Sequence, residues 1–179
     1  MPIEDAGYVS GRGTCVTGQI ERGTVRIGDV VEVVGWETTE CSCIGVEMFR
    51  KPLDEGRAGD TCAVFLDGIK PEDVPRGHVL VKPGTVKPHT KFTAEVTLLS
   101  TDQGGRAVAN GRRLQFTLRV TDVTGDVHFP EDVASVGPGG STTMEVTLVR
   151  AAPLEDGLHF AVREDGQDIG TGAVSQIIQ

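Results

Sequence analysis

Residues 43–60 read CIGVEMFRKPLDEGRAGD, and glycines interrupt the stretch at positions 45, 56 and 59. No helical period runs through it. Glu47 and Arg50 are three residues apart and flank two apolar residues, a Met and a Phe. The pattern is typical of a strand that ends in tight turns, with two opposite charges placed near its end.

Alternating apolar and polar residues occur on both sides of this stretch. They predict strands over residues 14–21, 29–34, 41–49, 60–66 and 78–81. The one helix-like segment before residue 82, residues 70–75, contains two prolines that limit it to about one turn. The first part of the chain is therefore expected to be an all-β unit of about six strands that closes into a barrel.

Residues 82–89 (KPGTVKPH) interrupt the strand pattern. Two prolines and a glycine in so short a segment are typical of a stiff, extended connector. Strand-length patterns resume beyond it and continue to the end of the chain, separated by a polar, glycine-rich loop at 102–113 that is long enough for a site or a partner contact. A second β-barrel or sandwich is expected there, with the boundary near residue 85.

Composition restricts the function. The 179 residues carry a net charge of −9, spread over both halves, so the chain lacks the basic surface that non-specific nucleic-acid binding needs. Any RNA contact must be local. No apolar run is long enough to span a membrane, and the N-terminus has no signal-peptide pattern. We expect a cytoplasmic protein without a membrane partner.

Catalytic and metal-binding motifs are missing. The sequence has no phosphate-binding loop, no H-E-x-x-H and no G-x-S-x-G, and its four histidines are scattered. We predict no catalytic residue and no metal site. The four cysteines are Cys15, Cys41, Cys43 and Cys62, and their spacing lacks the paired C-x2-C of zinc sites. Small buried thiols are the favoured interpretation, with a redox or metal role as the alternative.

A set of longer motifs falls in one order along the whole chain. They are PIED at 2–5, SGRGT at 10–14, RG at 22–23, GVEMFRK at 45–51, LDEGRAG at 53–59, KPGTVKPHTKF at 82–92, TDVTG at 121–125 and the spaced motif DGL-F-A-RE at 156–164. In this order they resemble the second and third domains of bacterial elongation factor Tu. The resemblance implies an all-β fold of two consecutive β-barrel domains, residues 1–84 and 85–179, joined by a short extended linker.

The resemblance also bears on cofactors and partners. The family carries a GTP-binding domain ahead of the PIED segment, so we expect no cofactor here, and GTP with magnesium only if such a domain exists upstream. The chain is expected to be either a fragment of a full-length factor or a natural relative without the GTPase domain. Aminoacyl-tRNA, the ribosome, and a GTPase domain in cis or in trans are the candidate partners.

In the family, the second domain holds the aminoacylated 3′ end of tRNA. The positions that the resemblance assigns to this pocket are Glu4, Asp5, Arg12, Glu47, Arg50 and Thr61. Carboxylates suit an α-ammonium group, and a guanidinium suits stacking or phosphate. The alternative is that Arg12, Glu47 and Arg50 form an ion network on the barrel rim with no ligand.

Two positions in this pocket depart from the family. Gly7 stands where an aromatic residue is expected, and Thr61 replaces an asparagine. Tyr8 is the nearest aromatic side chain, but the period of a strand puts it on the opposite face. Both changes fall in the amino-acid pocket, so we expect altered selectivity or lower affinity.

In the third domain, the resemblance assigns the tRNA T stem to Gln115, Thr124 and Glu164. Asp165 replaces a family glycine and adds a negative charge where a phosphate would approach. The loop after Gly104-Gly-Arg106 is also shorter than in the family. In the family this loop faces the nucleotide-exchange partner and the GTPase domain.

The favoured hypothesis is an aminoacyl-tRNA-binding module of an elongation factor Tu-like translation factor that lacks the GTPase domain and is not itself an enzyme. One alternative is a resistance decoy that binds antibiotics directed at the same pocket. Another is a protein-interaction module that uses a former domain interface.

Overall fold

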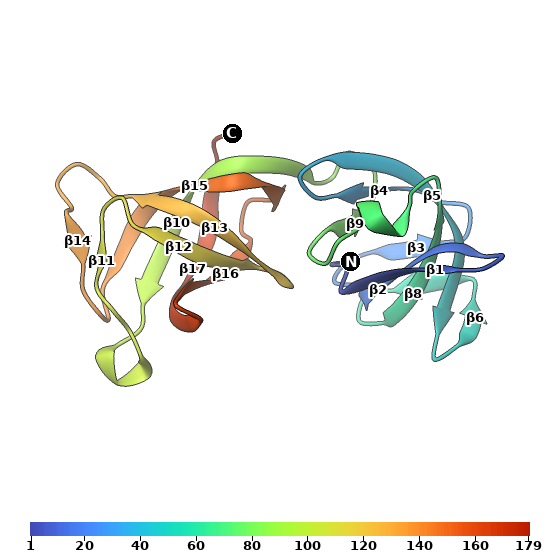
Figure 1. Cartoon of the computed structure of the whole chain (residues 1–179), viewed down its shortest axis with the longest axis horizontal. Helices are drawn as coiled ribbons and strands as arrows, with labels where there is room; N and C mark the ends of the chain where they lie inside the picture. Colours follow the sequence, from blue (N-terminus) through green and yellow to red (C-terminus); the bar gives the residue numbers. More distant parts are fainter. The chain divides into compact units, whose positions relative to one another are not determined.

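The computed structural model describes all 179 residues and divides into two compact units, Met1–Pro88 and His89–Gln179 (Figure 1). Strands dominate both units. The helical segments are two single 3-10 turns, η1 (Pro71–Asp73) and η2 (Thr101–Gln103). None of them has the length and apolar character that crossing a bilayer requires of a helix. The predicted all-β fold class is confirmed.

Most strands of the first unit belong to one antiparallel sheet. Its order is β1-β2-β8-β5-β4-β9, with β6 paired to the end of β5, while β3 and β7 form a separate ribbon. The strands are β1 (Asp5–Val9), β2 (Gly13–Gln19), β3 (Thr24–Arg26), β4 (Val30–Val34), β5 (Thr38–Met48), β6 (Lys51–Leu53), β7 (Glu55–Arg57), β8 (Thr61–Asp67) and β9 (Val79–Val81).

The N-terminal residues close this sheet. Pro2 bridges Val79 of β9, and the amide of Leu80 donates to the carbonyl of Met1 at 2.8 Å. Two residues further along, the amide of Glu4 donates to the carbonyl of Thr17 on β2 at 2.8 Å. One short segment therefore satisfies both edges of the sheet, and no long unpaired edge is left between β9 and β1.

Alternation along the strands explains the core of the first unit. Val16, Val64 and Val46 lie opposite one another across β2, β8 and β5, and each is at most 1% exposed. Burying a side chain of this size contributes about 1.5–3 kcal/mol. A slip of one residue would turn all three valines outward, so the register is firmly specified.

The second unit is a closed barrel with the strand order β10-β15-β13-β12-β16-β17, and β11 and β14 form a short ribbon beside it (Figure 1). Three phenylalanine rings meet in its core, because Phe92, Phe116 and Phe160 pack edge to face with centroids 5.6–6.5 Å apart. The strands are β10 (Lys87–Leu98), β11 (Val108–Ala109), β12 (Arg113–Leu118), β13 (Thr121–His128), β14 (Ser135–Val136), β15 (Ser141–Leu154), β16 (His159–Glu164) and β17 (Gln167–Ile177).

Two hairpins turn through a pair of residues in the left-handed backbone region. Phe49 and Arg50 join β5 to β6 with φ of 53° and 62°, and Asp165 and Gly166 join β16 to β17 with φ of 52° and 78°. Positive φ at both central positions is the type I′ geometry that matches the twist of paired strands. Asp-Gly is a favoured sequence for it, whereas Phe-Arg is not.

The connection from β10 to β11 is held by a close backbone approach at Gly105. A Cβ added there would lie 1.7 Å from the carbonyl oxygen of Leu99. The amide of Gly105 donates to the carbonyl of Ser100 at 2.8 Å, just after the capped turn η2. Only glycine fits without moving the backbone.

We therefore expect Gly105→Ala to lower the free energy of unfolding of the second unit by about 2–3 kcal/mol, as overpacking does. Gly137→Ala is the matched control, because an added Cβ there meets no atom within 4 Å. It should stay within about 0.5 kcal/mol of the unmodified chain. Urea denaturation followed by circular dichroism measures both, and equal midpoints for the two variants would contradict this account.

Candidate functional site

The register of the first unit places two rows of residues on the outer face of β1, β2, β8 and β5. Directly opposed residues of antiparallel strands have their side chains on one face. The first row runs Asp5, Thr17, Ala63, Glu47, and the second runs Gly7, Cys15, Phe65, Gly45. The first row has a carboxylate at each end, and the second row contains an aromatic ring. The two rows lie next to each other on the same face.

Arg12 joins these two rows. It follows the turn after β1, where its amide donates to the carbonyl of Val9. Its guanidinium carbon lies 3.7 Å from the centroid of the Phe65 ring, and its Nη1 lies 2.6 Å from Oε1 of Glu47. Phe65 faces outward yet is only 4% exposed, and the guanidinium covers the outer face of its ring. The Arg12 side chain itself remains 44% exposed.

Other predicted pocket residues lie around this cluster. Glu4 and Asp5 are exposed, and Asp5 Oδ1 accepts a hydrogen bond from the amide of Ala6 at 2.9 Å. Thr61 is exposed at the start of β8, on the same face as Phe65 four residues later. Arg50 lies in the turn beyond Glu47. The structure thus joins Arg12 to Glu47 directly, whereas Arg50 forms no ion pair with Glu47.

Gly7 leaves an opening in this surface. A Cβ added to it meets no atom within 4 Å, so nothing fills the position beside Cys15. Tyr8 pairs with Thr14, whose side chain is buried on the inner face, so it does not fill the gap. Its ring is 69% exposed at the end of β1.

On the second unit, two of the three predicted contact residues are neighbours. Gln115 on β12 lies opposite Thr124 on β13 and opposite Arg163 on β16. Arg163 is 3.2 Å from Asp122 and 3.0 Å from Asp168. The side-chain amide of Gln115 and the hydroxyl of Thr124 therefore lie on one outer face, beside an arginine whose charge is paired with two aspartates.

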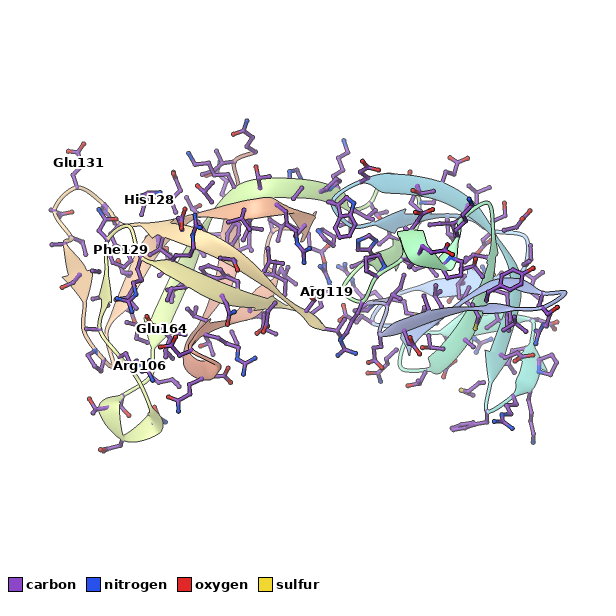
Figure 2. All side chains as sticks on the ribbon, in the orientation of Figure 1. Arg106, Arg119, His128, Phe129, Glu131 and Glu164 are labelled. Atoms are coloured by element: carbon purple, nitrogen blue, oxygen red, sulfur yellow. The ribbon has the colours of Figure 1, made fainter.

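Glu164, the third predicted residue, lies on the opposite face from Arg163 and is only 8% exposed. Its carboxylate bonds to Arg112 and lies 3.8 Å from Nη1 of Arg106 (Figure 2). Arg106 also contacts Asp165 at 3.2 Å. Glu164 is thus the centre of an ion network that ties the β10–β11 loop and the β11–β12 turn to the β16–β17 hairpin.

Comparison with protein-family models gives a match for each unit. The model described as Elongation factor Tu domain 2 matches residues 13–81, and the one described as Elongation factor Tu C-terminal domain matches residues 85–178. The chain belongs to the elongation factor Tu family. The resemblance inferred from the sequence motifs is confirmed, and so is the order of two consecutive β-domains.

Sequence reasoning missed several residues of these surfaces. The resemblance to the elongation factor Tu family assigns mainly charged positions to the pocket and does not include Phe65, although Phe65 occupies an outward position of β8, on the opposite face from Val64. The sequence marks Arg106 and Arg112 only as members of a polar loop. Their approach to Glu164 joins segments more than 50 residues apart, which no local pattern reports.

The cysteines of this elongation factor Tu-family chain are free thiols. Cys41, Cys43 and Cys62 are buried, and Cys15 is half-buried beside the candidate site. Burial raises the pKa of the Cys41 thiol to about 11, with smaller contributions from Cys43 and Glu40. Burial also raises the pKa of Cys15, which Glu47 raises further and Arg12 lowers. The geometry fits the interpretation of three cysteines as small core residues.

The raised pKa of Cys41 predicts an alkaline loss of stability. Its contribution is fully present below the unfolded pKa near 9 and is lost as pH rises through about 11, because the unfolded chain ionises first. Over that window Cys41 should account for up to about 2–3 kcal/mol. Between pH 8 and pH 10.5, the urea midpoint should fall less for Cys41→Ala than for the unmodified chain. Parallel curves would show that this thiol does not titrate differently on folding.

Proposed function

We propose that this chain is the aminoacyl-tRNA-binding part of an elongation factor Tu-family translation factor. The 3′ end of the tRNA would lie on the outer face of β1, β2, β8 and β5. The observation that carries the proposal is the side chain of Arg12, which stacks on Phe65 and pairs with Glu47. It places a hydrogen-bond acceptor and a cationic plane on one exposed face, held by the ring beneath.

This chemistry suits the unpaired end of an RNA. Such an end presents a ribose hydroxyl and an open base face that a protein can hydrogen-bond and stack. Glu47 is 16% exposed and keeps an oxygen for a hydroxyl or amino donor, while Arg12 offers the outer plane of its guanidinium. The exposed carboxylates Glu4 and Asp5 would attract the α-ammonium of an esterified amino acid.

The second unit would contact the T stem through Gln115 and Thr124. A side-chain amide and a hydroxyl are suited to phosphate oxygens and 2′-hydroxyls rather than to base sequence. Glu164 would act by positioning Arg106 and Arg112, whose side chains are 41% and 54% exposed. With a net charge of −9, the chain would bind tRNA weakly on its own.

No catalytic role is proposed for these residues. In this proposal the chain would act in the cytoplasm, and GTP with magnesium would enter only through a GTPase domain, in cis or in trans. Such a domain and the ribosome are the further partners that the proposal includes.

The proposal predicts that the chain slows hydrolysis of the ester bond in aminoacyl-tRNA. At micromolar protein, the deacylation rate should fall, and Arg12→Ala or Arg50→Ala should restore the unprotected rate. Arg26→Ala is the matched control, because Arg26 pairs with Glu55 between β3 and β7, away from this face. No protection by the unmodified chain would reject the proposal. Binding of pocket-directed antibiotics without protection would favour the decoy hypothesis instead.

The opening at Gly7 predicts a gain of affinity. Gly7→Phe restores an aromatic wall in space that is empty, which contributes about 1–3 kcal/mol of apolar contact. Thr61→Asn restores an amide hydrogen bond of about 0.5–1.5 kcal/mol. The double variant should bind aminoacyl-tRNA at least about tenfold more tightly. Unchanged affinity in a filter-binding titration would mean that the aminoacyl group does not occupy this surface.

A further inference from the structure

We propose that Phe49, at the tip of the β5–β6 hairpin, is a stacking residue for an unpaired nucleobase. The inference rests on the proposed function, because it adds a second contact for the same RNA end. It names the ligand class at this tip as a single-stranded nucleotide, held by its aromatic face rather than by base-specific hydrogen bonds.

The first observation is the backbone of the tip. Met48 pairs with Lys51, so Phe49 and Arg50 alone form the turn, with φ of 53° and 62°. The left-handed region costs a residue with a side chain roughly 1–2 kcal/mol relative to the right-handed one. Such outliers concentrate at ligand clamps and switches, where the surrounding structure holds them. The paired strands β5 and β6 supply that support here.

The second observation is exposure. Phe49 is 88% exposed, the largest exposed fraction among the exposed large apolar residues of the chain. The ring contributes nothing to either core cluster. Arg50 and Lys51 are exposed beside it. An aromatic ring flanked by two cations thus projects from a chain that is acidic overall.

The third observation is the position of the tip relative to the candidate site. Glu47, which pairs with Arg12, lies two residues before Phe49 on the same hairpin and opposite Pro52. Two residues of extended chain span at most about 7 Å. An RNA end bound at the Arg12–Glu47 pair would therefore lie within reach of the hairpin tip that carries Phe49.

The composition of the tip favours a nucleic acid over a protein partner. Aromatic residues and Arg are enriched in protein interfaces, so Phe49 and Arg50 alone would suit either partner, but Lys is depleted there. Proteins that hold single strands combine aromatic platforms with cations that contact the backbone. Phe49, Arg50 and Lys51 match the second pattern. A protein ligand becomes one outcome of the test.

The first test measures binding of an RNA minihelix with an unpaired 3′ end, with a blunt-ended minihelix for comparison. Phe49→Ala should weaken binding of the first RNA roughly 5- to 150-fold, the range of one lost stacking contact, and leave the second unchanged. Phe49→Trp should retain affinity. The matched control is Ile27→Ala, which removes a 52% exposed apolar side chain elsewhere on the unit. Equal affinity of Phe49→Ala and the unmodified chain for the first RNA would overturn the inference.

A second measurement separates this inference from the proposed function. Trp36 is the single tryptophan, so the double variant Trp36→Phe, Phe49→Trp carries one fluorophore at the tip. Addition of the unpaired-end RNA should quench its emission, and the blunt RNA should not. Quenching without ester protection would reject the aminoacyl-tRNA function but retain the stacking site. Protection without quenching would do the reverse, and a response to neither RNA would leave the tip to a protein partner and overturn the inference.

Discussion

The guanidinium of Arg12 organises the functional face of the first unit. It lies on the ring of Phe65 in β8, pairs with Glu47 in β5 and follows the turn that leaves β1. A cation–π contact at an exposed site contributes about 0.5–1 kcal/mol, and an exposed ion pair about 0.2–1 kcal/mol. These energies are small beside the burial of the valine core. The consequence of the contact is therefore positional, since it fixes one carboxylate oxygen and one guanidinium plane on the outside of the barrel.

The second unit uses arginine in a different way. Glu164 is nearly buried, and a buried carboxylate is costly unless cations and hydrogen bonds compensate it. Arg106 in the β10–β11 loop and Arg112 in the β11–β12 turn provide that compensation, and the same Arg106 contacts Asp165 in the β16–β17 turn. The negative charge at Asp165, unusual beside a surface expected to meet phosphate, is therefore matched locally. The network holds the loop whose glycine approaches the backbone of Leu99.

The strands and the core followed from alternation, because Val16 and Val64 occupy inward positions that a period of two already marks. Which charged residues would meet was only partly predictable. The family resemblance assigns Arg12 and Glu47 to one pocket, whereas the contact of Arg12 with Phe65 is evident only in the structure. A bulge between Cys43 and Gly45 shifts the register of β5 against β8, and such a shift leaves no signature in a local pattern. Which side chains meet across these strands therefore depends on long-range geometry, which residue types and local patterns do not predict.

The two left-handed turns give an internal comparison. Asp165-Gly166 forms its turn with residues that adopt positive φ at little cost. Phe49-Arg50 forms the same kind of turn with two bulky side chains, at a cost of about 1–2 kcal/mol for each. Both turns join paired strands, so the demands of the hairpin are alike. Stability alone would favour Asn-Gly or Asp-Gly at positions 49 and 50. The side chains present there are instead an exposed ring and a cation. The stacking contact that we propose for Phe49 would account for that choice, whereas the geometry of the hairpin does not.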